Sequence, residues 1–150
     1  MVKDRKLFLL IALIVILDQI AKYFARQIAH PIDFGFFEFS LVKNTGSLFG
    51  MMQNLNGIFI WLSLIAIGLL LFYYPEFKNF KTKLAISIIL SGILGNLIDR
   101  IFLGYVTDFI NFRFWPVFNI ADSCLTVGII LILFSELFQG QGRVRYTRKK

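Results

Sequence analysis

The stretch that decides the fold reads LAISIILSGILGNLIDRIFL over residues 84–103. About 20 residues of α-helix cover roughly 30 Å, which is the thickness of the hydrocarbon core of a bilayer. The stretch is mostly apolar up to Gly95, and then Asn96, Asp99 and Arg100 follow near its end. We therefore expect a membrane-spanning helix whose polar side chains lie close to one membrane surface.

Three further stretches have the same character. They run from Leu7 to Ala25, from Ile58 to Tyr74 and from Ile120 to Phe138. The chain is 57% hydrophobic, whereas soluble domains are roughly 45 to 50% apolar. No polar linker or internal repeat divides its 150 residues. We predict one domain over residues 1–150, an all-α membrane bundle of four transmembrane helices.

The basic residues give the chain a net charge of +7, but they cluster between the apolar stretches. This clustering argues against a nucleic-acid partner. They lie in the N-terminus, in the turn that holds Lys78, Lys81 and Lys83, and in the C-terminal tail. Lys and Arg in short loops mark the cytoplasmic side. We expect both termini in the cytoplasm, and the segments Arg26 to Gly57 and Gly104 to Asn119 outside.

Both outer segments alternate between apolar and polar residues. Phe37, Phe39 and Leu41 alternate with Glu38 and Ser40, and Phe112 and Phe114 alternate with Asn111 and Arg113. A period of two residues indicates short strands. Their aromatic content suits a surface at the level of the lipid headgroups, and simple interfacial anchoring explains it equally well.

Ionisable residues inside the apolar stretches need a reason, because each costs roughly 2.5 to 3.5 kcal/mol on insertion scales. Asp18 and Lys22 are four residues apart, so they share a helix face and can pair. Lys22 and Arg100 together can offset Asp18 and Asp99, whichever way the four pair. In the expected orientation all of these residues fall in the outer half of the bilayer, so a site formed by them opens outward.

Asp108 and Asp122 then remain without an assigned cation. Asp108 follows the outer end of the third stretch and Asp122 opens the fourth, so the loop between them can bring the carboxylates together. Two carboxylates in a dehydrated site do not both ionise easily, which leaves one acid beside one base. Such a pair can activate water against an amide. The ordinary alternative is that Asp122 caps its helix and Asp108 faces water.

Two other kinds of function compete with hydrolysis. A small four-helix, proton-coupled transporter would use Asp18 or Asp99 as its proton carrier, but such a carboxylate needs access from both sides. The inner halves of the four stretches are almost wholly apolar. A noncatalytic assembly subunit predicts nothing about paired aspartates. Cys124 is the only cysteine, so no cysteine-based zinc site is expected.

Five motifs, in family order and across nearly the whole chain, resemble the type II (lipoprotein) signal peptidases. They are DQIAK at 18–22, NTGSLFG at 44–50, GILGNLIDR at 92–100, VTDF at 106–109 and FNIAD at 118–122. Two departures stand out: Ser47 and Leu48 replace small residues such as Ala-Ala, and Ala21 replaces a frequent hydroxyl residue. Neither departure touches a proposed catalytic group.

The resemblance implies four transmembrane helices with a small extracytoplasmic β-sheet platform and a short outer helix. It implies an aspartyl endopeptidase of the bacterial cytoplasmic (inner) membrane. Such an enzyme cuts the signal peptide of a prolipoprotein just before its diacylglyceryl-modified cysteine. The partners expected are prolipoprotein substrates and membrane lipids, with no nucleic acid. No metal or organic cofactor is implied, and we expect a monomer.

Carried onto this sequence, the resemblance makes Asp108 and Asp122 the catalytic dyad, the same pair that the charge balance isolates. Asn44, Asn96, Arg100 and Asn119 are implied to line the site. Asp18 is similar to a family position near the site with a structural role, and we expect Lys22 and Asp99 to be structural polar residues with it.

Overall fold

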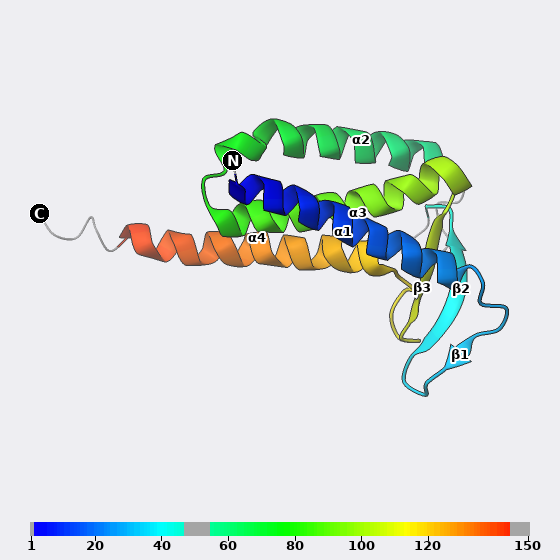
Figure 1. Ribbon diagram of the computed structural model, residues 1–150. Helices are drawn as coiled ribbons and strands as arrows, with labels where there is room; N and C mark the ends of the chain where they lie inside the picture. Colours follow the sequence, from blue (N-terminus) through cyan, green and yellow to red (C-terminus); the bar gives the residue numbers. More distant parts are fainter. Residues whose placement is uncertain (1, 47–54, 145–150) are drawn as a thin grey trace, which may run out of the picture.

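The computed structural model describes residues 2–46 and 55–144 (Figure 1). Four helices, a short 3-10 helix and three strands occur in this part of the chain. The helices are α1 (Val2–Ala25), α2 (Asn56–Tyr73), η1 (Tyr74–Glu76), α3 (Phe80–Leu103) and α4 (Ile120–Val144). The strands are β1 (Ile32–Asp33), β2 (Glu38–Asn44) and β3 (Val106–Asn111). The predicted class, a helical membrane bundle with a small sheet, is confirmed.

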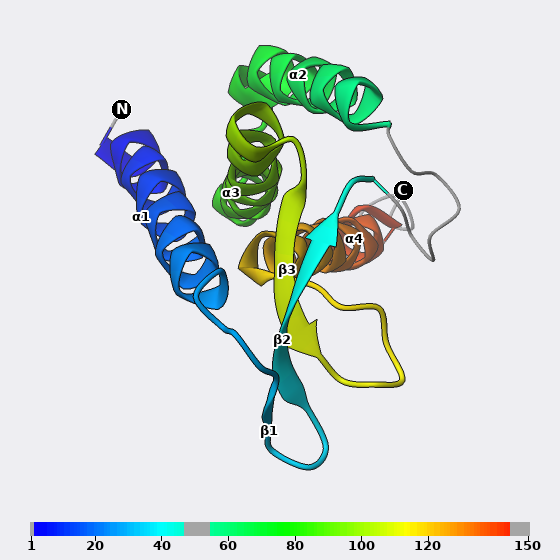
Figure 2. The same ribbon diagram turned by 90° about the vertical axis from the view of Figure 1, so that its right-hand side faces the viewer.

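Helix α3 lies at the centre of the bundle. It contacts α1, α2 and α4, and α2 lies against α3 and η1 (Figure 2). All three strands lie at one end of the bundle (Figure 1). The start of α1, the α2–α3 turn and the C-terminal part of α4 lie at the other end. The basic residues at the start of α1 and in the α2–α3 turn therefore share the end that faces away from the sheet.

The helix lengths agree with membrane spans. In the described residues, three segments are long and apolar enough to cross a bilayer: Asp4–Ala25, Asn56–Glu76 and Phe80–Leu103. The apolar part of α4, Ile120–Ser135, is shorter. However, α4 has 25 residues in all, which gives it a length of about 37 Å at 1.5 Å per residue.

The distribution of side chains is the reverse of that in a water-soluble protein. Helix α2 has no buried residue, and Trp61 and Phe72 on it are 69% and 75% exposed. By contrast, Asp18 and Lys22 are fully buried. Apolar surface of this extent is stable when lipid covers it. The polar residues therefore face the inside of the bundle.

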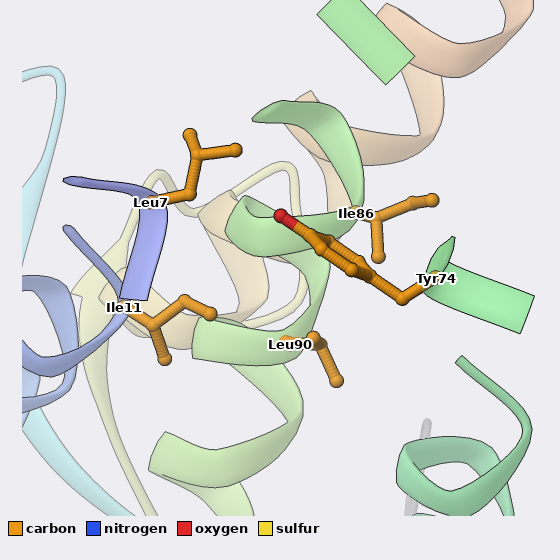
Figure 3. Close-up of a cluster of buried hydrophobic side chains, with 5 residues drawn as sticks. All are labelled: Leu7, Ile11, Tyr74, Ile86 and Leu90. Atoms are coloured by element: carbon orange, nitrogen blue, oxygen red, sulfur yellow. The ribbon is translucent and has the colours of Figure 1, made fainter. Parts of the chain in front are cut away.

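An apolar cluster joins α1 to α3 at the end away from the sheet (Figure 3). Leu7 and Ile11 of α1 lie against Ile86 and Leu90 of α3, with Tyr74 of η1 among them. In a bilayer this packing is stabilised by van der Waals contacts, because lipid chains are as apolar as these side chains. The cluster holds α1 and α3 together on the side of the polar residues that is farther from the sheet.

The sheet is antiparallel with the order β1-β2-β3. The strand predicted around Phe39 is confirmed as β2. The second predicted strand was placed too late: β3 ends at Asn111, before Phe112 and Phe114. The cause is local, because Arg113 has a positive φ of 65° and the amide of Phe114 donates to the carbonyl of Phe112 at 2.7 Å. A tight turn therefore replaces the strand.

Helix α3 ends where the sheet must begin. Gly104 follows the helix with a φ of 79°, and its amide donates to the carbonyl of Arg100 at 3.2 Å. This left-handed conformation is the usual end of a helix and favours glycine. The chain can then turn directly into β3. As a result Asp108 lies next to the sheet-side end of α3.

Close helix contacts at two glycines bring the polar residues together. A Cβ atom added to Gly95 of α3 would lie 2.6 Å from Asp18 Oδ2, and one on Gly92 would overlap the carbonyl oxygen of Ala121. Only glycine has the space for this approach. It allows Asp18 of α1 to reach the start of α4, where its Oδ1 accepts the Ala121 amide at 2.9 Å.

Candidate active site

Asp108 in β3 and Asp122 in the first turn of α4 are brought together by one asparagine. Asn119 Nδ2 donates to Asp108 Oδ1 at 2.7 Å, and the Asn119 amide donates to Asp122 Oδ2 at 3.2 Å. Asn119 is fully buried. The loop between α3 and α4 therefore returns the second carboxylate to the first.

Asp122 has two structural partners. The Asp122 amide donates to Asn119 Oδ1 at 2.9 Å, so Asn119 and Asp122 form a reciprocal capping box at the start of α4. Asp122 therefore does cap its helix, as the ordinary alternative from the sequence proposed, and it uses Oδ2 for this contact. The other oxygen, Oδ1, accepts from Asn96 Nδ2 at 2.8 Å. Capping accordingly fixes the carboxylate and directs it towards α3.

Asp108 does not face water, contrary to the other ordinary alternative. Its side chain is about 1% exposed, and its Oδ2 accepts from Asn44 Nδ2 of β2 at 2.9 Å. Burial, and then the negative charge of Asp122, raise the pKa of Asp108 to about 7. A carboxyl group with this pKa holds and releases a proton at neutral pH.

Lys22 is the centre of a buried ionic cluster. Its Nζ lies 2.9 Å from Asp18 Oδ2 and 3.6 Å from Asp99 Oδ2. It also donates to Asn96 Oδ1 at 2.9 Å. Removing one partner from such a cluster leaves an uncompensated buried charge, which typically costs 3 to 5 kcal/mol. The cluster joins α1 to α3 next to Asp108 and Asp122.

The sequence reasoning missed Arg26. Its Nη1 lies 3.8 Å from Asp99 Oδ1 and donates to Thr107 Oγ1 at 3.1 Å. Asp99 Oδ2 in turn accepts the Thr107 amide at 2.8 Å. The available signal was its position four residues after Lys22, which places both cations on one helix face. Arg26 links α1 and α3 to β3.

The expected role of Arg100 in offsetting Asp18 or Asp99 was wrong. Among the described residues no carboxylate lies within 4 Å of its guanidinium, and its Nε is buried without a hydrogen-bond partner. The guanidinium lies 5.1 Å from the centre of the Phe59 ring. The carboxylates whose negative charges act on this guanidinium are those of Asp122, Asp108 and Asp99. Its positive charge therefore belongs to the site.

The structure thus gathers the predicted residues at the sheet end of the bundle. Ser47 and Leu48, where the chain departs from the family pattern, lie outside the described residues. Within residues 2–46 and 55–144, no group of three or more His, Cys, Asp or Glu side chains is placed to hold a metal ion.

A buried polar site at one end of an apolar helical bundle is the organisation of a membrane-embedded enzyme. The fold is similar to that of two solved bacterial membrane enzymes. The match to the first has a TM-score of 0.84 at 29% sequence identity and covers 97% of this chain and 93% of the matched chain. The match to the second has a TM-score of 0.79 at 31% sequence identity and covers 88% of this chain and 92% of the matched chain.

The sequence comparison identifies the family. A family model described as Signal peptidase (SPase) II matches residues 10–138. A lipoprotein signal peptidase from Caldanaerobacter subterraneus subsp. tengcongensis is 41% identical, over 87% of this chain and 95% of the relative. One from Thermodesulfovibrio yellowstonii is 40% identical, over 85% and 91%. The chain belongs to the signal peptidase II family, a family of bacterial membrane proteases.

Proposed function

We propose that this chain is an aspartyl endopeptidase that removes the signal peptide from diacylglyceryl-modified prolipoproteins, just before the lipidated cysteine. Family membership supports the reaction and the class of substrate. The observation that carries the aspartyl mechanism is the pair Asp108 and Asp122. Asn119 bridges the two carboxylates inside the buried end of the bundle.

In this mechanism the two carboxylates share one proton. The ionised carboxylate takes a proton from water as the water oxygen attacks the scissile carbonyl carbon. The protonated one donates its proton to the carbonyl oxygen, which gives a neutral tetrahedral diol. The diol then loses a hydroxyl proton to one carboxylate, and the other carboxylic acid protonates the leaving cysteine nitrogen. The C–N bond breaks, and the dyad returns with one proton.

The residues around the dyad have separate roles in this proposal. Asn44, Asn96 and Asn119 each donate to a dyad oxygen and hold it in place. Arg100 supplies a positive charge that no described carboxylate neutralises by contact. That charge stabilises the negative charge of the dyad and favours its singly protonated form over the fully protonated one.

The transporter alternative is not favoured. Asp18 and Asp99, its candidate proton carriers, both lie next to Lys22 and are almost completely buried. Asp18 lies in the second half of α1, and Asp99 lies near the end of α3 that leads into β3. A transport carboxylate needs access to both membrane surfaces.

A direct reaction tests the proposed function. Purified protein in detergent is incubated with a diacylglyceryl-modified prolipoprotein, and the products are analysed by mass spectrometry. We expect one cut, which leaves the lipidated cysteine as the new N-terminus. Intact precursor, or a cut at another bond, would contradict the proposal.

We also propose that both termini face the cytoplasm and the sheet faces outward. Asp4 near the N-terminus pairs with Lys83 in the α2–α3 region at 2.7 Å, so two basic segments share one end of the bundle. In intact cells, terminal tags should be protected from added protease. A tag in the exposed β1–β2 turn at Gly35 should be cleaved. A C-terminal tag that is digested from outside would overturn this orientation.

A further inference from the structure

A continuous set of hydrogen bonds connects Lys22 to both aspartates. Lys22 Nζ donates to Asn96 Oδ1 at 2.9 Å, and Asn96 Nδ2 donates to Asp122 Oδ1 at 2.8 Å. Asn96 Oδ1 also accepts from Asn119 Nδ2 at 3.1 Å. Asn119 Nδ2 in turn donates to Asp108 Oδ1 at 2.7 Å. Each carboxylate is therefore one or two amides away from the ammonium group.

The ammonium group fixes the direction of this network. Lys22 has only donors, so the group facing it must be an acceptor, which is Asn96 Oδ1. The amide nitrogen of Asn96 must then face Asp122. Asn96 Oδ1 also accepts from Asn119 Nδ2, and this bond orients the side-chain amide of Asn119. Asn119 Oδ1 then accepts from the main-chain N–H of Asp122.

The result is a dyad surrounded by donors. All four carboxylate oxygens accept a hydrogen bond from a nitrogen: from Asn44 and Asn119 at Asp108, and from Asn96 and the Asn119 amide at Asp122. A protonated carboxyl group would find no acceptor among these four nitrogens. The proton that the two carboxylates share therefore has only the other carboxylate, water or substrate as its partner.

We propose that Lys22 is a positioning residue for the reaction: by fixing the direction of the Asn96 amide, it keeps the shared proton of Asp108 and Asp122 available to the scissile peptide. This inference rests on the proposed function. It gives Lys22 a role beyond that of a structural partner of Asp18 and Asp99.

Loss of the ammonium group has a definite consequence. Without it, Asn119 Nδ2 is the one remaining side-chain donor to Asn96 Oδ1 among the described residues, so the Asn96 amide rotates more easily and can present Oδ1 to Asp122. Asp122 would then hold a proton and donate it to that oxygen. The dyad would keep a proton in a place where the substrate does not reach it. Such an effect lowers kcat and leaves substrate binding unchanged, because the lost interaction concerns the chemical step.

The charged groups around the dyad come from α1, α3 and β2. They are Lys22 and Asp18 on α1, Arg26 directly after α1, Asp99 and Arg100 on α3, and Lys43 on β2, which lies over the Tyr105 ring. Helix α2 has no charged residue. The positive charge of Lys22 lowers the pKa of Asp108. Removing it therefore raises that pKa, and the pH profile moves to higher pH.

The test compares Lys22→Met with Lys22→Arg in the purified enzyme and a lipidated prolipoprotein. For Lys22→Met we expect kcat to fall about 10- to 100-fold, as is typical when a group that orients a functional residue is lost. KM should be unchanged, and the alkaline limb of the pH profile should move up by about one pH unit. Lys22→Arg keeps a donor and the positive charge. It should therefore keep most of the unmutated kcat, and the alkaline limb of its pH profile should stay at the unmutated position.

A second variant covers the case in which Lys22→Met alone does not fold. The double variant D18N/K22M removes both charges of one ion pair, so neither charge is left buried alone. Asp99 still has Arg26 as an ionic partner. It should show the same fall in kcat as Lys22→Met, but a smaller shift of the pH profile, because one positive and one negative charge are removed together. Asp18→Asn alone is the matched control, because Lys22 still contacts Asn96. It should lower thermal stability and leave kcat close to the unmutated value, and the alkaline limb of the pH profile should not move to higher pH.

The Asn96→Ala background separates amide orientation from simple loss of charge. If Lys22 acts through Asn96, Lys22→Met should lower kcat little further in that background. The inference is overturned if folded Lys22→Met or D18N/K22M protein keeps the unmutated kcat and pH profile. It is also overturned if Lys22→Met has its full effect on kcat without Asn96. Activity that survives in Asp108→Asn would instead reject the proposed function itself, so the two failures are distinguishable.

Discussion

Asp108→Asn and Asp122→Asn should each abolish cleavage of a lipidated prolipoprotein, with kcat lower by about 10⁴-fold or more. Asn keeps the shape of the side chain and loses the acid-base function. The protein should still fold and insert, because the apolar cluster and the Lys22 cluster remain intact. The measurement is turnover by purified protein whose folding has been checked by thermal unfolding in detergent.

The double variant D108N/D122N should be no worse than either single variant. Groups that act as one unit lose their contribution together, so their effects do not add. A dyad that shares a proton also gives a rate that rises and falls with pH. We expect the alkaline limb near the pKa of about 7 of Asp108. There the dyad loses its only proton and the acid is gone. In acid the second carboxylate takes a proton and the base is gone, so both apparent pKa values belong to the pair.

One result would remove the dyad from the mechanism. If folded Asp122→Asn protein cleaved the precursor at close to the unmutated rate, Asp122 would be only the partner of Asn119 in the capping box. Its carboxylate would then stabilise α4 and take no part in the reaction.

The second large effect concerns the lipid on the substrate. We expect the precursor without its diacylglyceryl group to be cut with a kcat/KM at least about 100-fold lower. A 100-fold change corresponds to about 2.8 kcal/mol. Each buried methylene contributes about 0.8 kcal/mol, so even four methylenes in contact with protein or detergent reach this value. The acyl chains anchor the cleavage site at the membrane depth of the dyad.

The comparison uses lipidated and unlipidated forms of one precursor, with the same sequence and in the same detergent. A control is the D108N variant, which should cleave neither form. Equal rates for the two forms with the unmutated enzyme would show that the acyl chains do not contribute to recognition.

The helical membrane class and three of the eight limits of the four spans could be predicted from the amino-acid sequence alone. The expected ends at Ala25 and Leu103 and the expected start at Ile120 agree with the structure. This works because the length of an apolar stretch needed to cross a bilayer is a local property, independent of the rest of the fold. The strand around Phe39 was also predictable, since its alternation is local.

The candidate dyad was found from the sequence for a different reason. Asp108 and Asp122 were the carboxylates left after the others had been matched with cations, and the family motifs selected the same pair. The matching itself was partly wrong, because Lys22 contacts both Asp18 and Asp99 while Arg100 contacts neither within 4 Å. The number of charges follows from the sequence, but the pairing does not.

The direction of the contacts between distant segments follows only from the three-dimensional arrangement of the chain. Residues 22, 96, 108, 119 and 122 lie on four different elements or in the loop before α4, and no periodic pattern relates them. Their hydrogen bonds exist because Gly92 and Gly95 let α1, α3 and α4 approach closely and because Gly104 turns the chain into β3. Whether an asparagine donates to a carboxylate or accepts from an ammonium group depends on both neighbours at once. For Asn96 those neighbours are Lys22 and Asp122, 74 and 26 residues away in the chain.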